Sequence, residues 1–302
     1  MWFRNLQIYL LSTPFELTAE ALHEKLLGRP SRKCGTLEVS THGWEPPLGR
    51  HGKLLVHAVS HCTMICMRHE QKILPAAVVN QQLTQRIADL EEAGGRKIRR
   101  RERGEIKDEI LLDMLPKAFT KTVLTYAYID HRNAWLLIDS ASRKRAEELI
   151  TLLRETLGSL PLRPLEVNNA PVRAMTDWLQ HKRLPPAFAV GDECELRGPA
   201  EAGGVVRCRH QDLEGSEIAA HLKAGKEVVR MSLEWREKVG FVLTAELALK
   251  RLKFPDLIQE AAAENGGEDH ATRFDVEFAL MSLELERFIN SLIKLFGGVV
   301  KA

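Results

Sequence analysis

The sequence predicts an α+β protein, with mixed antiparallel sheets and helices in two units and a helical segment projecting from the first unit. Three observations predict this fold class. Alternation typical of strands occurs in both halves of the chain, apolar residues at helical spacing lie between these segments, and a Gly-Gly pair at 94–95 separates two consecutive helical segments. The 302 residues are enough for two or three domains.

The first unit is expected to be a sheet with two helices. Residues 2–11 have the partial alternation of a strand, 53–60 and 63–68 form a predicted hairpin, and 121–130 and 134–140 return to strand character. Residues 43–52 are rich in Gly and Pro and are expected to form a loop, and 160–164 an irregular crossing. Helices are predicted over 17–27 and over 142–157, where Ser142 is the N-cap and Gly158 the stop.

A pair of helices is predicted to project from this sheet. Apolar residues recur every three or four positions from 79 to 90, and the helix should stop at the Gly-Gly pair. A second helical pattern, from 106 to 115, ends at Pro116.

The remainder of the chain is predicted to be a second α+β unit. It should contain helices at 171–181 and 215–224, strands at 191–196 and 205–211, and a meander of 227–235, 240–244 and 248–254. A long helix with an apolar stripe is predicted over 270–296. The expected division is a central region (1–75 plus 120–168), a helical tip (76–119) and a base (169–302).

Positive charge is concentrated in one segment. The net charge of the chain is +2, but residues 96–107 alone carry +5, so the rest of the chain sums to −3. Screening limits an exposed charge to a reach of about 8 Å at physiological salt, so such a cluster binds a polyanion where dispersed charges would not. We therefore predict that these basic residues bind the phosphate backbone of DNA: Arg96, Lys97, Arg99, Arg100, Arg101, Arg103 and Lys107.

Two details favour this interpretation over an ordinary solvated helix face. If the segment is helical throughout, its basic side chains form a single stripe at positions 96, 99, 100, 103 and 107, and like charges on one face need an anionic partner. Most of them are Arg, whose planar guanidinium matches phosphate geometry. A protein-interaction module that meets an acidic partner remains an alternative.

Phe119 lies between Lys117 and Lys121 and has three open interpretations. It could be a core residue at a helix end, an exposed contact to nucleic acid, or a contact to a second subunit.

No catalytic residue, metal site or cofactor is expected. Successive strand side chains point to opposite faces, so Cys62 and Cys66 should face away from His61 and His69 and cannot share one ion with them. Phosphate-binding and nucleophile-elbow motifs do not occur in the sequence. The charges of Asp108, Glu109 and Asp113 fit a solvated helix start better than a two-metal nuclease, which remains the enzymatic alternative.

The composition favours a cytoplasmic protein. No run of about 18 apolar residues is present to span a membrane, and the N-terminus lacks a secretory leader. The odd number of cysteines, in a chain that is not small, favours buried thiols over disulfides: Cys34, Cys62, Cys66, Cys194 and Cys208.

Six strings along the chain resemble the bacterial RdgC family of recombination-associated proteins. They are MWFRNL at 1–6, GWEPPLG at 43–49, EQKILP at 70–75, LPKAF at 115–119, LGSLP at 157–161 and LKRLKF at 249–254. The resemblance runs in order over essentially the whole chain. It implies a homodimer closed into a ring that encircles double-stranded DNA without sequence preference, with single-stranded DNA as a further ligand. It also implies antagonism of the RecA recombinase and a location at the nucleoid.

The resemblance also implies roles for particular residues. Lys117 and Phe119 match the string that forms the family's tip interface. Lys at position 117 keeps the positive charge of an Arg but cannot form the two-point hydrogen bonds that a guanidinium makes. His210 and Gln211 match its base contact, and His210 stands where the family has a more basic residue. The expected DNA-binding set is thus extended by Lys117, Arg207, Arg209, His210 and Gln211, and the expected dimer interface contains Lys117, Phe119 and Phe296.

Overall fold

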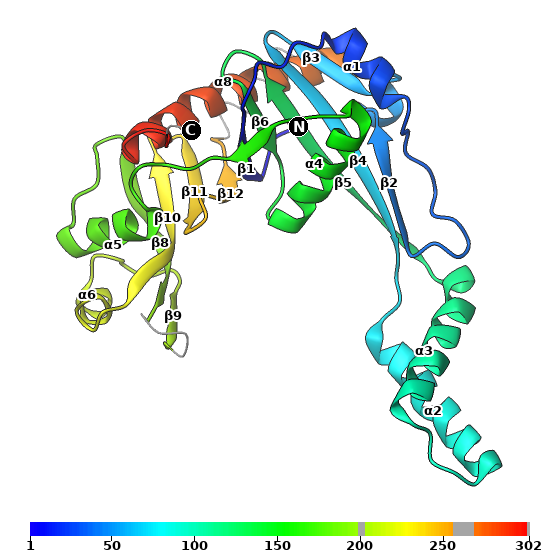
Figure 1. The fold of residues 1–302 in the computed structure, drawn as a ribbon. Helices are drawn as coiled ribbons and strands as arrows, with labels where there is room; N and C mark the ends of the chain where they lie inside the picture. Colours follow the sequence, from blue (N-terminus) through cyan, green and yellow to red (C-terminus); the bar gives the residue numbers. More distant parts are fainter. Residues whose placement is uncertain (199–202, 256–268, 301–302) are drawn as a thin grey trace.

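The chain folds into an arch (Figure 1). The computed structural model describes residues 1–198, 203–255 and 269–300. The central region lies at the top of the arch, and two parts extend downward from it on opposite sides. One is the helical tip, formed by α2 (Ala76–Gly94) and α3 (Arg100–Met114), and the other is the base, which contains the strands β8 to β12.

The central region is built on antiparallel strands: β1 (Asn5–Leu11), β2 (Ser40–Glu45), β3 (Val56–Val59), β4 (Cys62–Lys72), β5 (Thr120–Asp130), β6 (Trp135–Ile138) and the short β7 (Leu162–Pro164). β4 and β5 are paired over their full lengths of 11 residues and carry the chain into and out of the tip. A 3-10 turn (Gly49–His51) follows β2. The helices α1 (Ala19–Leu26) and α4 (Arg143–Leu157) complete this region.

The base continues the same sheet. Its strands are β8 (Phe188–Arg197), β9 (Val205–Cys208), β10 (Glu227–Trp235), β11 (Val239–Thr244) and β12 (Leu249–Lys253), joined by α5 (Pro171–His181) and α6 (Ser216–Lys223). The strand order β2-β4-β5-β6-β1-β12-β11-β10-β8-β9 makes β1 the link between the two parts. β1 pairs with β6 through residues 7–10 and with β12 through only Asn5 and Leu6.

Apolar side chains on opposite faces of the central sheet enter different cores. Ile65 and Leu136 pack with residues of α1 and α4, such as Leu22 and Leu149. The neighbouring strand residues on the other face pack with α8 (His270–Leu295), which also enters the core of the base. Because one helix contributes to the cores of both parts, the central region and the base are held as one body.

The tip has a much smaller core, made by Leu83, Ile106 and Ile110 with three half-buried neighbours. α2 ends at Gly95, whose φ of 60° is the left-handed conformation that glycine adopts at little cost. A short 3-10 turn (Leu115–Lys117) then leads from α3 into β5.

Local signals in the sequence predicted most elements well. α4 has Ser142 as its N-cap and Gly158 as its C-cap, and α5 and β10 have the predicted bounds. The loop predicted over 43–52 is partly wrong, because Gly43 and Trp44 belong to β2. Trp44 is buried and its Nε1 donates to Thr156 Oγ1 at 3.0 Å, which fixes this Gly- and Pro-rich segment as a strand.

Candidate nucleic-acid interface

The basic segment of the tip is only partly helical. α3 begins after Arg99, which has an extended backbone, so residues 96–99 form the connection from α2. The predicted single stripe is therefore wrong for Arg96 and Arg99, because the turn at Gly95 interrupts the helix. Arg100, Arg103 and Lys107 do form a stripe on α3, and all three are exposed.

Two of the seven cations in this segment are neutralised by neighbouring carboxylates. Arg96 makes a two-point ion pair with Glu102, Nη1–Oε2 3.0 Å and Nη2–Oε1 2.7 Å. This contact, together with the backbone N–H of Arg99, lowers the pKa of Glu102 to about 2. Arg101 pairs with Glu105 at 3.2 Å. In the part of the chain that the structure describes, the other five cations form no salt bridge, although Arg99 also helps to lower the pKa of Glu102: Lys97, Arg99, Arg100, Arg103 and Lys107.

A second basic cluster lies at β9 in the base. Arg207 and Arg197 both bind Glu195, at 2.9 and 3.1 Å. Burial raises the pKa of Glu195, but the hydrogen bonds from the two arginines outweigh it, so the net shift is downward. Arg209 is exposed and has no ion pair among the described residues. The cluster therefore has one guanidinium without a salt bridge in the described part of the chain, that of Arg209 near Glu193, and two that share a carboxylate.

His210 and Gln211 follow β9 directly. His210 is 84% exposed, and its Nδ1 lies 2.9 Å from Asp192 Oδ2. Its φ of 52° is in the left-handed region, which is uncommon for a residue with a side chain. The Gln211 side chain donates to Glu217. The four residues predicted for the base therefore do lie together, and three of them are held by acidic neighbours: Arg207, His210 and Gln211.

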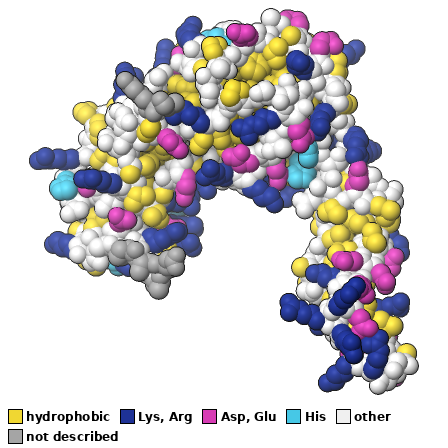
Figure 2. Space-filling view, in the orientation of Figure 1, with side chains coloured by type: hydrophobic (Ala, Val, Ile, Leu, Met, Phe, Trp, Pro, Cys, Tyr) yellow, Lys and Arg dark blue, Asp and Glu magenta, His cyan; other side chains and the backbone are white. Residues whose placement is uncertain are grey.

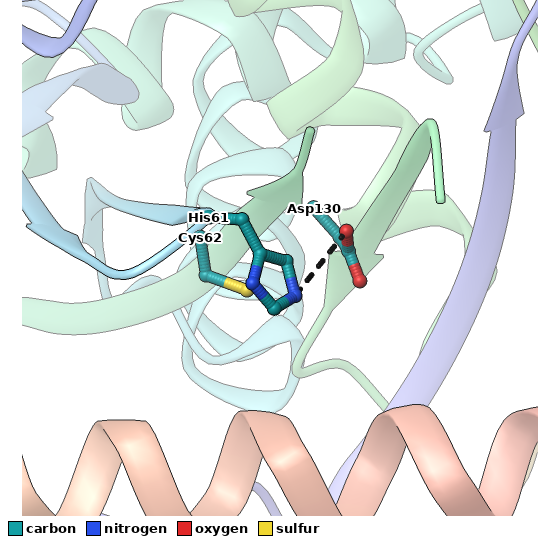
Figure 3. A group of neighbouring side chains, drawn as sticks. All are labelled: His61, Cys62 and Asp130. Carbon is teal, nitrogen blue, oxygen red and sulfur yellow. Dashed lines mark ion pairs between the residues drawn. The ribbon is translucent and has the colours of Figure 1, made fainter. Parts of the chain in front are cut away.

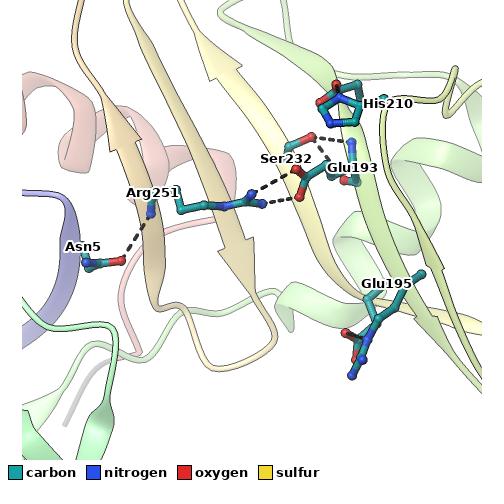
Figure 4. A network of polar contacts seen from close by, with 8 residues as sticks. Asn5, Glu193, Glu195, His210, Ser232 and Arg251 are labelled. Carbon is teal, nitrogen blue, oxygen red and sulfur yellow. Dashed lines mark hydrogen bonds and ion pairs between the residues drawn. The ribbon is translucent and has the colours of Figure 1, made fainter.

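The open face of the base sheet carries a polar network (Figure 4). Arg251 binds the carboxylate of Glu193 with both terminal nitrogens, and its backbone N–H donates to Asn5 Oδ1 at 3.3 Å. Ser232 Oγ accepts from the Glu193 backbone at 2.8 Å. Because Asn5 belongs to β1, this network connects the central region to the base.

Basic side chains are found on the concave side of the arch. Figure 2 shows Lys and Arg along its inner rim and near the end of the tip, with acidic side chains interspersed. In Figure 1 the connection between α2 and α3 lies at the lower end of the tip, and β9 lies at the lower end of the base. The two clusters therefore stand at the two ends of the arch, with basic groups between them.

Phe119 lies at the neck where the tip joins the sheet, and it is 84% exposed. Its backbone oxygen accepts from Ile73 N at 2.7 Å, and the Ile73 side chain is itself 46% exposed. The structure excludes a core role for Phe119 within this chain, and its contact to nucleic acid or to a second subunit stays a prediction. Lys117, in the 3-10 turn that follows α3, is exposed as well.

Phe296 does not offer a surface for a second copy. Its side chain is fully buried, with the Trp178 ring at a centroid distance of 5.5 Å. The expected dimer contact at Phe296 is corrected accordingly: the apolar stripe of the C-terminal helix is used for the core of the chain itself.

The acidic residues considered for a nuclease, Asp108, Glu109 and Asp113, are all exposed on α3. Among the described residues, the group whose ligand atoms could hold a metal ion is a different one, formed by His61, Cys62 and Asp130 (Figure 3). The expectation that His61 and Cys62 face opposite ways is wrong, because β4 begins only at Cys62 and the alternation of a strand does not extend to His61. In the described part of the chain, each helix is too short or too polar to cross a bilayer.

Comparisons with known proteins give a consistent result over the whole chain. A family model described as "RdgC: Putative exonuclease, RdgC" matches residues 1–299. A relative from Tolumonas auensis named "Recombination-associated protein RdgC" is 41% identical over 298 residues, which cover 99% of each chain. Relatives of the same name from Pseudomonas paraeruginosa and Yersinia enterocolitica are 44% and 42% identical, over 99% of this chain and 98% of theirs.

Proposed function

Because the chain belongs to the RdgC family of recombination-associated proteins, we propose that it binds double-stranded DNA on the concave side of the arch, without sequence preference and without cleaving it. The observation that carries this proposal is the set of five cations in the tip that form no salt bridge among the described residues. Unpaired arginines bind phosphate without first breaking an internal ion pair.

The shape of the chain supports a ring formed by two copies. An arch with free ends at the tip and the base can be closed by a two-fold axis, which requires one self-complementary contact at each end. The neck is suited to such a contact because Phe119 and Ile73 are exposed side by side. We place the base contact near His210 and Gln211, at the free end of β9. Central region, tip and base would then act as three domains of one clamp.

A clamp of this kind limits recombination by occupying DNA. A ring around the duplex excludes a RecA filament from the same stretch, so antagonism of RecA needs no direct contact between the two proteins. Such a protein belongs in the cytoplasm at the nucleoid. Single-stranded DNA has the same phosphates at a lower charge density and would bind more weakly, because each contact releases fewer counterions.

Encirclement is tested by the topology of the DNA. The protein is bound to a closed circular duplex and to a linear duplex of the same sequence, and the lifetime of each complex is measured after addition of competitor. We expect a long lifetime on the circle, a short one on the linear DNA, and recovery when both linear ends are blocked. Equal lifetimes on all three would exclude a ring but leave phosphate binding intact.

Nuclease activity is the second candidate, because the description of the matching family model includes the word exonuclease. The exposed carboxylates on α3 do not gather into a metal cluster in the described part of the chain. End-labelled DNA incubated with the protein and Mg²⁺ or Mn²⁺ should therefore stay intact. The protein would be an enzyme if the DNA were shortened in a metal-dependent way by every purified preparation, and if replacing a single carboxylate abolished that shortening.

A further inference from the structure

A nitrogen, a sulfur and an oxygen atom suited to bind a metal come together beside α8 (Figure 3). They belong to His61, Cys62 and Asp130, and the ligand atoms all lie within 4.8 Å of one another. Neither cluster of the proposed DNA-binding surface includes these residues. In Figure 1, α8 runs along the top of the arch, whereas the basic clusters stand at its two lower ends.

The chain brings these three residues together by a tight turn and a strand pairing. Cys62 and Asp130 are direct partners across β4 and β5, so their side chains share one face of the sheet. His61 lies in the turn before β4, after Ser60 with its left-handed φ of 55°. The His61 backbone oxygen accepts from His131 N at 3.0 Å, which fixes this turn against the end of β5.

A fourth donor comes from α8. Glu286 Oε2 lies 3.7 Å from His61 Nε2, and Asp130 Oδ1 lies 3.8 Å from the same nitrogen. Asn133 Nδ2 holds the two carboxylates in place by donating to Asp130 Oδ2 at 2.8 Å and to Glu286 Oε1 at 3.1 Å. The separations from His61 are too long for hydrogen bonds. Two carboxylate oxygens thus surround the imidazole without bonding to it.

The charge around this cluster is poorly balanced. The side chains of Asp130 and Glu286 are 2% and 16% exposed. The cationic side chain near them is Arg132, which lies 3.9 Å from Glu286 and is itself 66% exposed. Asp130 has no Lys or Arg partner among the described residues, and its two oxygens accept only neutral hydrogen bonds, from Asn133 N at 2.9 Å and Asn133 Nδ2 at 2.8 Å. Two carboxylates with so little water and so little positive charge favour a bound cation.

We propose that His61, Cys62, Asp130 and Glu286 form a structural site for a zinc-type divalent cation. A mixed set of imidazole, thiolate and carboxylate ligands suits Zn²⁺ rather than Mg²⁺ or Ca²⁺, which prefer oxygen alone. In a tetrahedral zinc site neighbouring ligand atoms stand roughly 3.3–3.6 Å apart, from bond lengths of about 2.0–2.3 Å. The separations of 3.7 and 3.8 Å at His61 are a few tenths longer. Glu286 lies outside the group of three residues whose ligand atoms are all within 4.8 Å of one another, so its side chain would have to move toward the ion to complete the site.

The site would join three separate parts of the chain. It links the turn between β3 and β4, the end of β5 and the middle of α8, and α8 also packs in the core of the base. A bound cation would therefore fix the helix that holds the central region and the base together. The Cys62 thiol loses its proton on binding, so metal uptake releases protons to the buffer.

The test uses the full chain, reduced and stripped of metal with a chelator. Zn²⁺ should bind at one equivalent per chain and raise the midpoint of thermal unfolding. Co²⁺ in its place should give a thiolate-to-cobalt charge-transfer band. His61→Ala and Glu286→Gln should each weaken Zn²⁺ binding by about 100-fold or more, since even indirect partners of a metal cost ~10–100-fold. Cys62→Ser should abolish the charge-transfer band.

Matched controls separate this site from other donors. Cys34→Ser and Cys208→Ser remove the two half-buried thiols and should leave the band unchanged. The stacked pair His51 and His270, with ring centroids 4.2 Å apart, is the competing place for an adventitious ion, and His51→Ala should change nothing. The proposal is overturned if Zn²⁺ does not bind, or if binding survives in the folded His61→Ala and Cys62→Ser variants. DNA affinity of these variants is a separate measurement, so neither proposal depends on the other.

Discussion

Arg96 and Glu102 form a two-point ion pair across the turn that starts α3, with Nη1–Oε2 at 3.0 Å and Nη2–Oε1 at 2.7 Å. Glu102 also accepts from the Arg99 backbone at 2.9 Å. One carboxylate therefore both caps a helix and neutralises one of the cations of the proposed DNA-binding surface.

Glu102→Gln should raise the affinity for DNA by a few fold, because it releases the Arg96 guanidinium for phosphate. Glu109→Gln is the matched control: it removes the same charge from the same helix, where no ion pair is broken among the described residues. Titration of a labelled duplex at fixed salt compares the two variants. An equal gain in both would mean that only the overall charge matters.

The stripe on α3 should account for part of the salt dependence of DNA binding. Removing one phosphate contact lowers the slope of log K against log salt by about 0.9 for duplex DNA. We expect slopes reduced by about that amount for each of Arg100→Ala, Arg103→Ala and Lys107→Ala. Arg101→Ala should have a smaller effect because its guanidinium already pairs with Glu105. A slope unchanged in the triple variant would show that the phosphates bind elsewhere.

Phe119→Ala should weaken self-association with little effect on folding, because the side chain is 84% exposed in the single chain. Leu112→Ala, on α3 at 53% exposure, removes a comparable apolar group from the tip and is the control. Sedimentation over a range of concentrations measures the dimer constant. If Phe119→Ala associates as tightly as the parent chain, the neck is not an interface.

Two glycine substitutions should change the free energy of unfolding in opposite directions. Gly104 lies inside α3 with open space around its Cβ position, so Gly104→Ala should raise the free energy of unfolding of the tip by roughly 1 kcal/mol. At Gly43 a Cβ would lie 2.6 Å from the Pro30 backbone oxygen, so Gly43→Ala should destabilise by about 1–3 kcal/mol. Denaturant unfolding measures both, and hydrogen exchange in the tip detects the first if the tip opens independently.

Tyrosine ionisation should report global unfolding at high pH. Burial, and for Tyr9 also the hydrogen bond to Glu147, raises the pKa of Tyr9 and of Tyr126 to about 12. Burial raises the pKa of Tyr128 further still. These are all three tyrosines of the chain. A pKa raised in the folded state contributes stability that is complete below pH 10 and is lost as pH rises toward 12.

We therefore expect little tyrosinate absorbance from the native chain between pH 10 and 11, and full ionisation near pH 10 in denaturant. Tyr9→Phe should remove one proton from the transition and leave its position nearly unchanged. Gradual ionisation of three equivalents near pH 10, without loss of circular dichroism, would contradict the burial of these hydroxyls.

The sequence predicted those helices and strands whose ends are marked by residues close to them in the chain. Ser142 and Gly158 mark both ends of α4, and the Gly-Gly pair marks the end of α2. β2 was missed because its strand geometry depends on pairing with β4, where Trp44 lies opposite Met67, a relationship that no local pattern contains.

The candidate site was likewise predicted only in part. Its basic residues are visible in the sequence, but their pairing is not, since Glu195 binds arginines 2 and 12 residues away. His61 was placed on the wrong face because the pattern does not tell where a strand begins. The burial of Phe296 could not be foreseen either, because an apolar stripe looks the same whether a core or a second chain covers it.

The ladder between β1 and β12 has mechanical consequences. Its two residue pairs are the shortest junction along the strand order that runs from one limb of the arch to the other. If the tip and the base were pulled apart, the sheet would open first between β1 and β12. The helix α8, which packs across this junction, would then bend and resist the opening. The distance between the tip and the base is then variable, and the bending stiffness of α8 sets how far it can change.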